Sequence, residues 1–189
     1  APVARHLPPA RSRVLVGADC LQAFSGCSSL TSISIPEGVT SIGNWAFSGC
    51  RSLTSITIPG SVTSIGTGTF QRCRSLTAIN VNETSAIFKS LDGVLYDGAA
   101  TTLLQYPNGR TDTSYSIPAG VTAIGVYALA YSRNLTSMTI PDGVTTIAER
   151  AFDSCEYLAS VALPDTTENE GRQAVGVGDA LRGSAQGLA

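Results

Sequence analysis

Cysteine is the residue type in this chain with the most scope for chemistry, and four of the five cysteines occupy the same position of a sequence repeat. These are Cys27, Cys50, Cys73 and Cys155, whereas Cys20 stands outside that position. The chain has no CxxC pair, so a zinc site is not expected. Equivalent positions of a repeat stack on one another, which predicts a ladder of buried, reduced thiols. A disulfide between neighbouring turns is the alternative, and it requires Cα atoms within about 7 Å.

Histidine and paired acids, the usual groups of hydrolytic and metal chemistry, are scarce. His6 is the only histidine and lies near the N-terminus, which excludes a His-based triad or a multi-His metal site within the repeats. The carboxylates of Glu37, Asp142 and Asp165 are expected in solvent, and the repeat brings no two of them together as a catalytic pair. We therefore expect no catalytic residue, no cofactor and no metal, and a protein that is not an enzyme.

The composition points to a folded, β-rich protein and excludes two classes of partner. Of the 189 residues 43% are hydrophobic, enough to bury a core, while only 6% are aromatic and 14% charged, which suits thin stacked layers. The net charge of -2 provides no basic field for nucleic acid. The apolar runs are far shorter than the roughly 20 residues that span a bilayer, so no membrane span is expected.

A repeat of 23 residues positions the cysteines and organises most of the chain. The clearest copies are LTSISIPEGVTSIGNWAFSGCRS at 30–52, LTSITIPGSVTSIGTGTFQRCRS at 53–75 and LTSMTIPDGVTTIAERAFDSCEY at 135–157. A further copy at 112–134 has Asp112 where the others have leucine. With partial units at both ends, the sequence predicts about six turns.

Each unit combines a strand, a turn and a short compact segment. Leu30, Ile33 and Ile35 alternate as in a strand whose apolar side faces inward, and Pro36 ends the pairing. The segment AFSGC at 46–50 is expected to form one helical turn with its apolar side chains in the core. One unit buries too little to offset the entropy of ordering it, so the units fold only as an array. The predicted fold is an α/β repeat with stacked parallel strands.

One unit carries an insertion. Leu76 and Asp112 are 36 residues apart, which is 13 more than the repeat. The segment 86–107, AIFKSLDGVLYDGAATTLLQYP, contains Asp-Gly pairs at 92–93 and 97–98 between β-favouring runs, the pattern of tight hairpin turns. We predict a β-hairpin insert whose strands lie near Phe88, at 94–96 and at 103–106.

The pattern LTSIxIPxGVTSIGxxAFxxC closely resembles the BspA-type leucine-rich repeats of bacterial surface proteins, which are also found in unicellular eukaryotes. The segment FKSLDGVLYDGAATTLLQYP is similar to the hairpin insert of that family. The resemblance covers residues 16–164 and implies a leucine-rich-repeat solenoid. It also implies adhesion, or binding to host or matrix proteins, without identifying the partner.

The outward positions of the predicted strands form the candidate binding surface. Stacked in register, they make a flat and neutral face rich in hydroxyl groups, which is either a merely soluble strand surface or a binding face. The residues of this strand face are Ser32, Ser34, Ser55, Thr57, Ala78, Asn80, Ser114, Ser116, Ser137 and Thr139.

Three regions follow from this division: a basic N-terminal arm at 1–15, the solenoid at 16–164 and a low-complexity tail at 165–189. The leading hypothesis is a non-enzymatic protein-binding module, adhesin-like, at the cell surface or outside the cell. A second is an accessory subunit of a larger assembly that docks through its tails, and a third is carbohydrate or ice binding by the strand face. The basic arm is either a solvated linker or the start of a mature chain after removal of a targeting peptide, for instance to an organelle.

Overall fold

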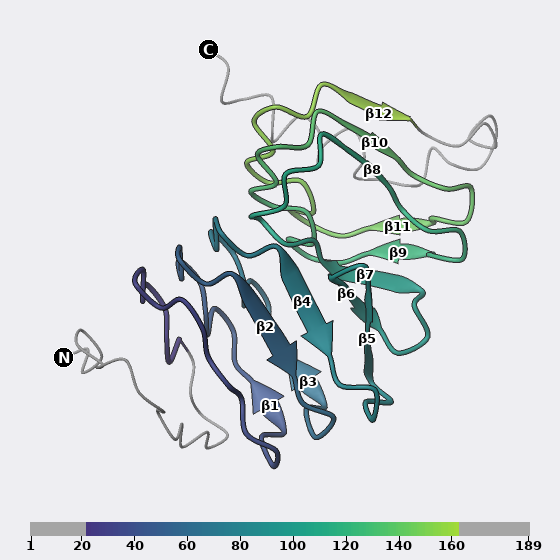
Figure 1. Ribbon diagram of the computed structural model, residues 1–189. Helices are drawn as coiled ribbons and strands as arrows, with labels where there is room; N and C mark the ends of the chain where they lie inside the picture. The colour runs from purple at the N-terminus through teal and green to yellow at the C-terminus, as the bar shows by residue number, and fades with distance from the viewer. Residues whose placement is uncertain (1–21, 163–189) are drawn as a thin grey trace.

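The structure, a computed structural model, describes residues 22–162 as a β-solenoid of about five turns (Figure 1). The sequence-based count of about six included partial units at both ends. The described strands are β1 (Ser41–Ile42), β2 (Ser55–Ile58), β3 (Ser64–Ile65), β4 (Ala78–Val81), β5 (Phe88–Leu91), β6 (Val94–Asp97), β7 (Thr102–Gln105), β8 (Ser114–Ser116), β9 (Ala123–Ile124), β10 (Ser137–Thr139), β11 (Thr146–Ile147) and β12 (Ser160–Ala162).

The strands of successive coils stack in parallel, as the repeat predicted. In the first ladder β2 pairs with β4, and β10 pairs with both β8 and β12. In the second ladder β1 pairs with β3, and β9 pairs with β11. Partners are offset by one repeat, as with Ser41 opposite Ser64. Because the register equals the repeat, each inward-facing residue lies against its equivalent in the next coil.

Threonine hydroxyl groups reinforce the bonds between coils. The side chain of Thr63 donates to the carbonyl oxygen of Thr40 at 3.1 Å, and Thr77 donates to Thr54 at 3.2 Å. Thr136 makes the same contact with Thr113 at 3.0 Å. The Thr of the LTS and VTS motifs therefore has a structural role, because its hydroxyl adds a second hydrogen bond to a carbonyl that already accepts the amide of the same residue.

The predicted one-turn helices are wrong: among the described residues the AFSGC segments form consecutive turns. The amide of Ser48 bonds to the carbonyl of Trp45 in its own coil, whereas the amide of Phe47 bonds to the carbonyl of Thr69 in the next coil. Trp45 has a φ of 59° and Gly49 a φ of 74°. Left-handed residues at this spacing break an α-helix and turn alternate amides toward the neighbouring coil. The inward direction was nevertheless correct, since Ala46, Phe47 and Cys50 are buried.

The insert forms an antiparallel hairpin of β5 and β6, whose tip is the predicted tight turn at 92–93. Asp92 and Gly93 both have positive φ, 49° and 76°, as a two-residue hairpin turn of this hand requires. The second Asp-Gly pair does not form such a turn. There the Asp97 carboxylate accepts the amides of Thr101 and Thr102, at 2.7 and 3.0 Å, and closes a longer loop.

Strand β7 returns the chain to the solenoid. It pairs antiparallel with β6 on one side and parallel with β9 on the other. The hairpin is thus inserted between the two strands of one coil, and it lies between two groups of coils (Figure 1). The buried residues form two clusters that meet here, with Leu95 in the first and Val94 and Tyr96 in the second. Strand β6 therefore has both of its faces buried.

Candidate functional site

The strand face is exposed where the sequence placed it. Along β2, Ser55 and Thr57 are exposed whereas Ile56 and Ile58 are buried, so side chains alternate between solvent and core. Of the predicted residues, the exposed ones are Ser32, Ser34, Ser55, Thr57, Asn80, Ser114, Ser116 and Thr139, while Ala78 and Ser137 are half-buried. Ser32 and Ser34 lie in the equivalent stretch of the first described coil, which forms no regular strand.

The face extends one coil further than predicted. In β12, Ser160 lies opposite Ser137 and Ala162 opposite Thr139. The sequence contained the signal, because LASVALP at 158–164 begins another copy of the strand.

The hairpin divides the strand face into two parts. One part is the pair β2–β4 and the other is the three-stranded sheet β8–β10–β12 (Figure 1). At the boundary the amide of Ile79 in β4 donates to the carbonyl of Gly93 at 2.8 Å, and the Ser90 hydroxyl donates to the carbonyl of Ile79 at 2.7 Å. The hairpin therefore makes hydrogen bonds to the edge of β4 that would otherwise pair with β8. The predicted single, flat face is therefore interrupted.

The hydroxyl groups of the strand face have no partner within the described part of the chain. None of Ser55, Thr57, Ser114, Ser116 and Thr139 makes a side-chain hydrogen bond there, in contrast to the threonine ladders at the strand edges. A hydroxyl group donates one hydrogen bond and accepts two. The strand face thus presents rows of unused donors and acceptors to solvent.

Cys27, Cys50 and Cys73 form the predicted ladder of thiols in successive coils, whereas Cys155 stands apart because Gly109 and Ser132 hold that position in the two coils between. Cys27, Cys50, Cys73 and Cys155 are free, and the last three are buried. Each buried thiol donates to a carbonyl of the preceding coil: Cys50 to Phe24 at 3.2 Å, Cys73 to Phe47 at 3.1 Å and Cys155 to Leu129 at 3.1 Å. Burial raises the pKa of all three thiols to about 12. Since the thiolate is the reactive form, these groups are structural.

We expect Cys50, Cys73 and Cys155 to resist alkylation in the folded protein. A pKa near 12 leaves each thiol about a thousandfold less ionised at neutral pH than an ordinary cysteine, and burial adds a steric barrier. Iodoacetamide labelling followed by peptide mass spectrometry measures this at each site. Labelling in denaturant, where all thiols react, is the control. Labelling of Cys73 at the denatured rate without denaturant would contradict the ladder.

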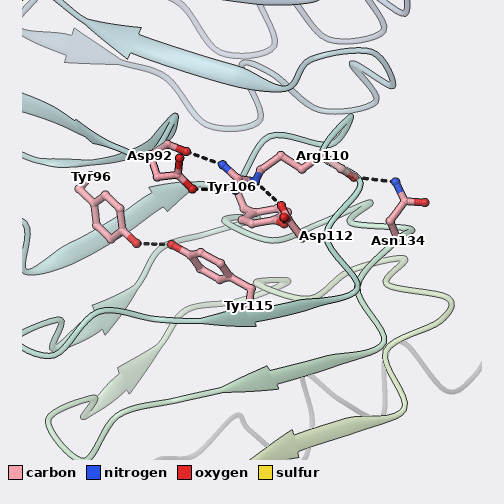
Figure 2. Close-up of polar contacts among 7 residues, drawn as sticks. All are labelled: Asp92, Tyr96, Tyr106, Arg110, Asp112, Tyr115 and Asn134. Atoms are coloured by element: carbon pink, nitrogen blue, oxygen red, sulfur yellow. Dashed lines mark hydrogen bonds and ion pairs between the residues drawn. The ribbon is translucent and has the colours of Figure 1, made fainter.

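A polar junction occupies the place where the repeat predicts leucine (Figure 2). Arg110 donates to the Asp112 carboxylate at 2.5 Å and to that of Asp92 at 2.8 Å, and it also donates to the Asp92 carbonyl. Asn134, from the next coil, donates to the Arg110 carbonyl at 2.6 Å. The arginine thus ties the tip of the hairpin to the first coil beyond it.

Tyrosines complete the junction. The Tyr106 hydroxyl donates to Asp112 at 3.1 Å, and the guanidinium of Arg110 lies 5.6 Å from the centre of the Tyr106 ring. The hydroxyls of Tyr96 and Tyr115 share a hydrogen bond of 2.5 Å (Figure 2). The hydrogen bond from Arg110 holds the pKa of Asp112 below its usual value. Asp112 therefore replaces leucine for a physical reason, which sequence reasoning missed although the exception itself was visible.

The potential metal ligands among the described residues are dispersed. No group of three or more His, Cys, Asp or Glu side chains within 22–162 is arranged to hold a metal ion. Glu37 and Asp142 are exposed, as expected. No helix of the described part is long and apolar enough to cross a bilayer. The predictions about His6, Cys20, Asp165, the arm at 1–15 and the tail at 165–189 concern residues outside the described ones.

Comparison with known proteins identifies the family of the repeat. Residues 20–92 and 108–175 match the BspA type leucine rich repeat region, with six copies. Comparison with curated proteins gives no significant match. The chain is similar to the crystal structure of a leucine-rich repeat protein from Eubacterium ventriosum, with 34% identity, a TM-score of 0.66 and coverage of 70% of this chain and 35% of the other.

Two further solved structures are similar. The Pneumococcal vaccine antigen PcpA is 26% identical, with a TM-score of 0.62 and coverage of 70% of this chain and 39% of the other. A leucine rich cell surface protein from Faecalibacterium prausnitzii is 32% identical, with a TM-score of 0.58 and coverage of 75% and 43%. The chain spans less than half of each of these structures. With most of its length matched by the repeat, the protein belongs to the BspA-type leucine-rich-repeat family.

Proposed function

We propose that this protein is a non-enzymatic protein-binding module, adhesin-like, which acts at the cell surface through its strand face. The observation that carries the proposal is the contrast between two sets of hydroxyl groups. Those at the strand edges bind the neighbouring coil, whereas those on the strand face are exposed and bind nothing in the described part of the chain. The similarity to a protein described as a cell surface protein supports the location.

The chemistry of the strand face suits a polar, uncharged contact. Its rows of Ser and Thr follow the spacing of stacked strands, about 4.8 Å, so a partner meets a regular series of donors and acceptors. Extended solenoid surfaces commonly serve such binding. Because none of the strand-face residues is charged, we expect the affinity to change little with salt.

Two alternatives remain open. Ice binding requires a regular face, and the division of the strand face at the hairpin argues against it. Carbohydrate binding stays an alternative that a glycan array tests. Docking of a larger assembly would use the residues outside 22–162. A chain truncated to 16–164 separates that alternative from the proposal, because it keeps the strand face and removes both tails.

Charged side chains on the strand face test the proposal. We expect the double variant Ser34→Lys, Thr57→Lys to bind extracellular-matrix proteins at least about tenfold more weakly than the parent, since two buried charges at an interface cost more than 1.4 kcal/mol. The measurement is saturation binding to a panel of purified, immobilised matrix proteins, with thermal unfolding to show that the fold survives.

The matched control is Ser25→Lys, Ser28→Lys, which places the same two charges at exposed positions outside the strands. It is expected to bind as the parent does. If the strand-face variant kept the parental affinity, the binding site would have to lie elsewhere on the molecule.

A further inference from the structure

A second surface carries unpaired charge. The turn edge, which we define here as residues 43–52 and 66–75 with the adjoining tyrosines Tyr127 and Tyr131, exposes three arginines: Arg51, Arg72 and Arg74. No acidic residue occurs in the sequence between Glu37 and Glu83. The turn edge is therefore positive although the chain as a whole has a net charge of -2.

Two of these arginines occupy the same position of the repeat. Arg51 and Arg74 are equivalent residues of neighbouring coils and both are exposed, so two like charges lie on one side of the stack. The same position two coils on has Arg133 and Glu156, which form an ion pair of 3.0 Å. Within residues 22–162, Arg51, Arg72 and Arg74 contact no carboxylate. At this repeat position the arginines of the first coils therefore have no carboxylate partner, whereas Arg133 in a later coil is neutralised by Glu156.

Aromatic side chains hold the turn edge in place. The half-buried Trp45 meets the Tyr127 ring edge-on, with ring centres 5.6 Å apart. Arg72 donates to the Tyr131 hydroxyl at 2.8 Å, and its guanidinium lies 4.9 Å from the centre of that ring. Trp, Tyr and Arg are the residues that contribute most to binding energy at protein interfaces. Their mutual contacts reduce the entropy that a partner would have to remove on binding.

These side chains also occupy backbone positions that disfavour them. Trp45, Arg72 and Tyr131 have φ of 59°, 58° and 62°. Glycine occupies the equivalent position in one neighbouring coil, Gly68 for Trp45 and Gly49 for Arg72, although other coils have non-glycine residues there with positive φ, such as Tyr127 at the Trp45 position. A residue with a Cβ atom in this conformation costs about 1 kcal/mol. The fold would accept glycine here, so the large side chains are not needed to form the turns.

We propose that the turn edge binds an acidic segment of a protein partner, with Arg51, Arg72 and Arg74 contacting carboxylates and Trp45 contacting apolar side chains between them. The cluster of unneutralised guanidinium groups selects an anionic partner, and the aromatic residues favour a polypeptide over other polyanions. This surface is separate from the strand face. Its test is therefore independent of the proposed function.

The single tryptophan provides the measurement, because Trp45 lies within the proposed site. The probe is a short synthetic peptide of Glu and Leu repeats, with the same peptide carrying Gln in place of Glu as its neutral counterpart. We expect the acidic peptide to change the fluorescence of Trp45 in a saturable manner and to lose affinity as salt rises. The Gln peptide is expected to have no effect.

The variant Arg74→Gln is expected to weaken binding of the acidic peptide about fivefold, and the matched variant Lys89→Gln, at an exposed cation in the hairpin, is expected to have no effect. Equal effects of the two variants, or no fluorescence change, would overturn the proposal. Heparin and duplex DNA are the competing polyanions, and fluorescence anisotropy of the labelled polyanion measures their binding. If either bound more tightly than the acidic peptide, and if Trp45→Phe left that binding unchanged, a polypeptide ligand would be rejected. If analytical sedimentation showed that the protein self-associates, and if Arg74→Gln abolished this, the turn edge would bind a second copy of the chain instead.

Discussion

Replacing Phe47 with Ala lowers the free energy of unfolding by about 3–5 kcal/mol, the largest change that we expect from a single substitution here. Phe47 is 3% exposed and lies between two equivalent rings, with ring centres 5.3 Å from Phe24 and 5.8 Å from Phe70. The three rings are nearly parallel, at 5° and 1°. Alanine leaves a cavity inside the stack and removes both ring contacts, and a rigid ladder cannot close around it.

Equilibrium urea denaturation followed by circular dichroism measures the loss. Because each coil is stabilised by its neighbours, hydrogen exchange should also speed up in the coils that contain Phe24 and Phe70. The comparison variant Ser34→Ala, at an exposed position of the strand face, is expected to change stability by less than about 0.5 kcal/mol. A loss of only about 1 kcal/mol for Phe47→Ala would show that the ladder relaxes around the cavity.

The repeat made the ladders predictable from sequence. A constant spacing places equivalent residues on one another whatever the detailed path of the chain, so the parallel strands, the stacked thiols and the outward hydroxyls all followed from it. The hairpin tip was predictable for a different reason. Asp92-Gly93 provides two residues that tolerate positive φ, and that is a local requirement.

The AFSGC segment was predicted wrongly because its side-chain spacing fits two conformations. Ala46, Phe47 and Cys50 would share one face of a helix, and they also point inward from consecutive turns. The choice is made by hydrogen bonds to the next coil, such as that from the amide of Phe47 to Thr69. The left-handed conformation of a non-glycine residue such as Trp45 cannot be recognised from the residue type.

The polar junction was also beyond sequence reasoning. Asp112 was visible as an exception to the repeat, but its partner Arg110 and the hairpin residue Asp92 come together only through the path of the insert. The hairpin divides the core into two clusters, and neighbouring residues of β6 belong to different ones: Leu95 to the first cluster and Val94 to the second. The junction spans this division with charged groups where the repeat would otherwise place leucine.

Replacing Arg110 with Ala is expected to lower the free energy of unfolding by about 2 kcal/mol. Hydrogen bonds to charged groups contribute about 1.5–3 kcal/mol when buried. The Arg110 side chain is 15% exposed, but its partners are 41% exposed for Asp112 and 86% for Asp92, so solvent screening reduces the contribution of each bond. The control is Arg133→Ala, whose exposed ion pair with Glu156 should contribute less than about 0.5 kcal/mol.

The pH dependence identifies the cause of that loss. Arg110 holds the pKa of Asp112 below its unfolded value of about 3.9, so the contribution of the pair is complete above that pH and disappears as the pH falls through the lower, folded pKa. The difference in stability between the parent and Arg110→Ala should therefore be constant near neutral pH and shrink in acid. Urea midpoints across the acid range measure it.

The Asp97 carboxylate is an internal control, because it does not contact Arg110 and should keep its acid dependence in both proteins. Burial raises the pKa of Asp97, but hydrogen bonds from Thr102 and Thr101 outweigh that effect and lower it on balance. A difference that stayed the same down to the acid limit would mean that Arg110 stabilises the junction by packing against Tyr106 rather than by its charge.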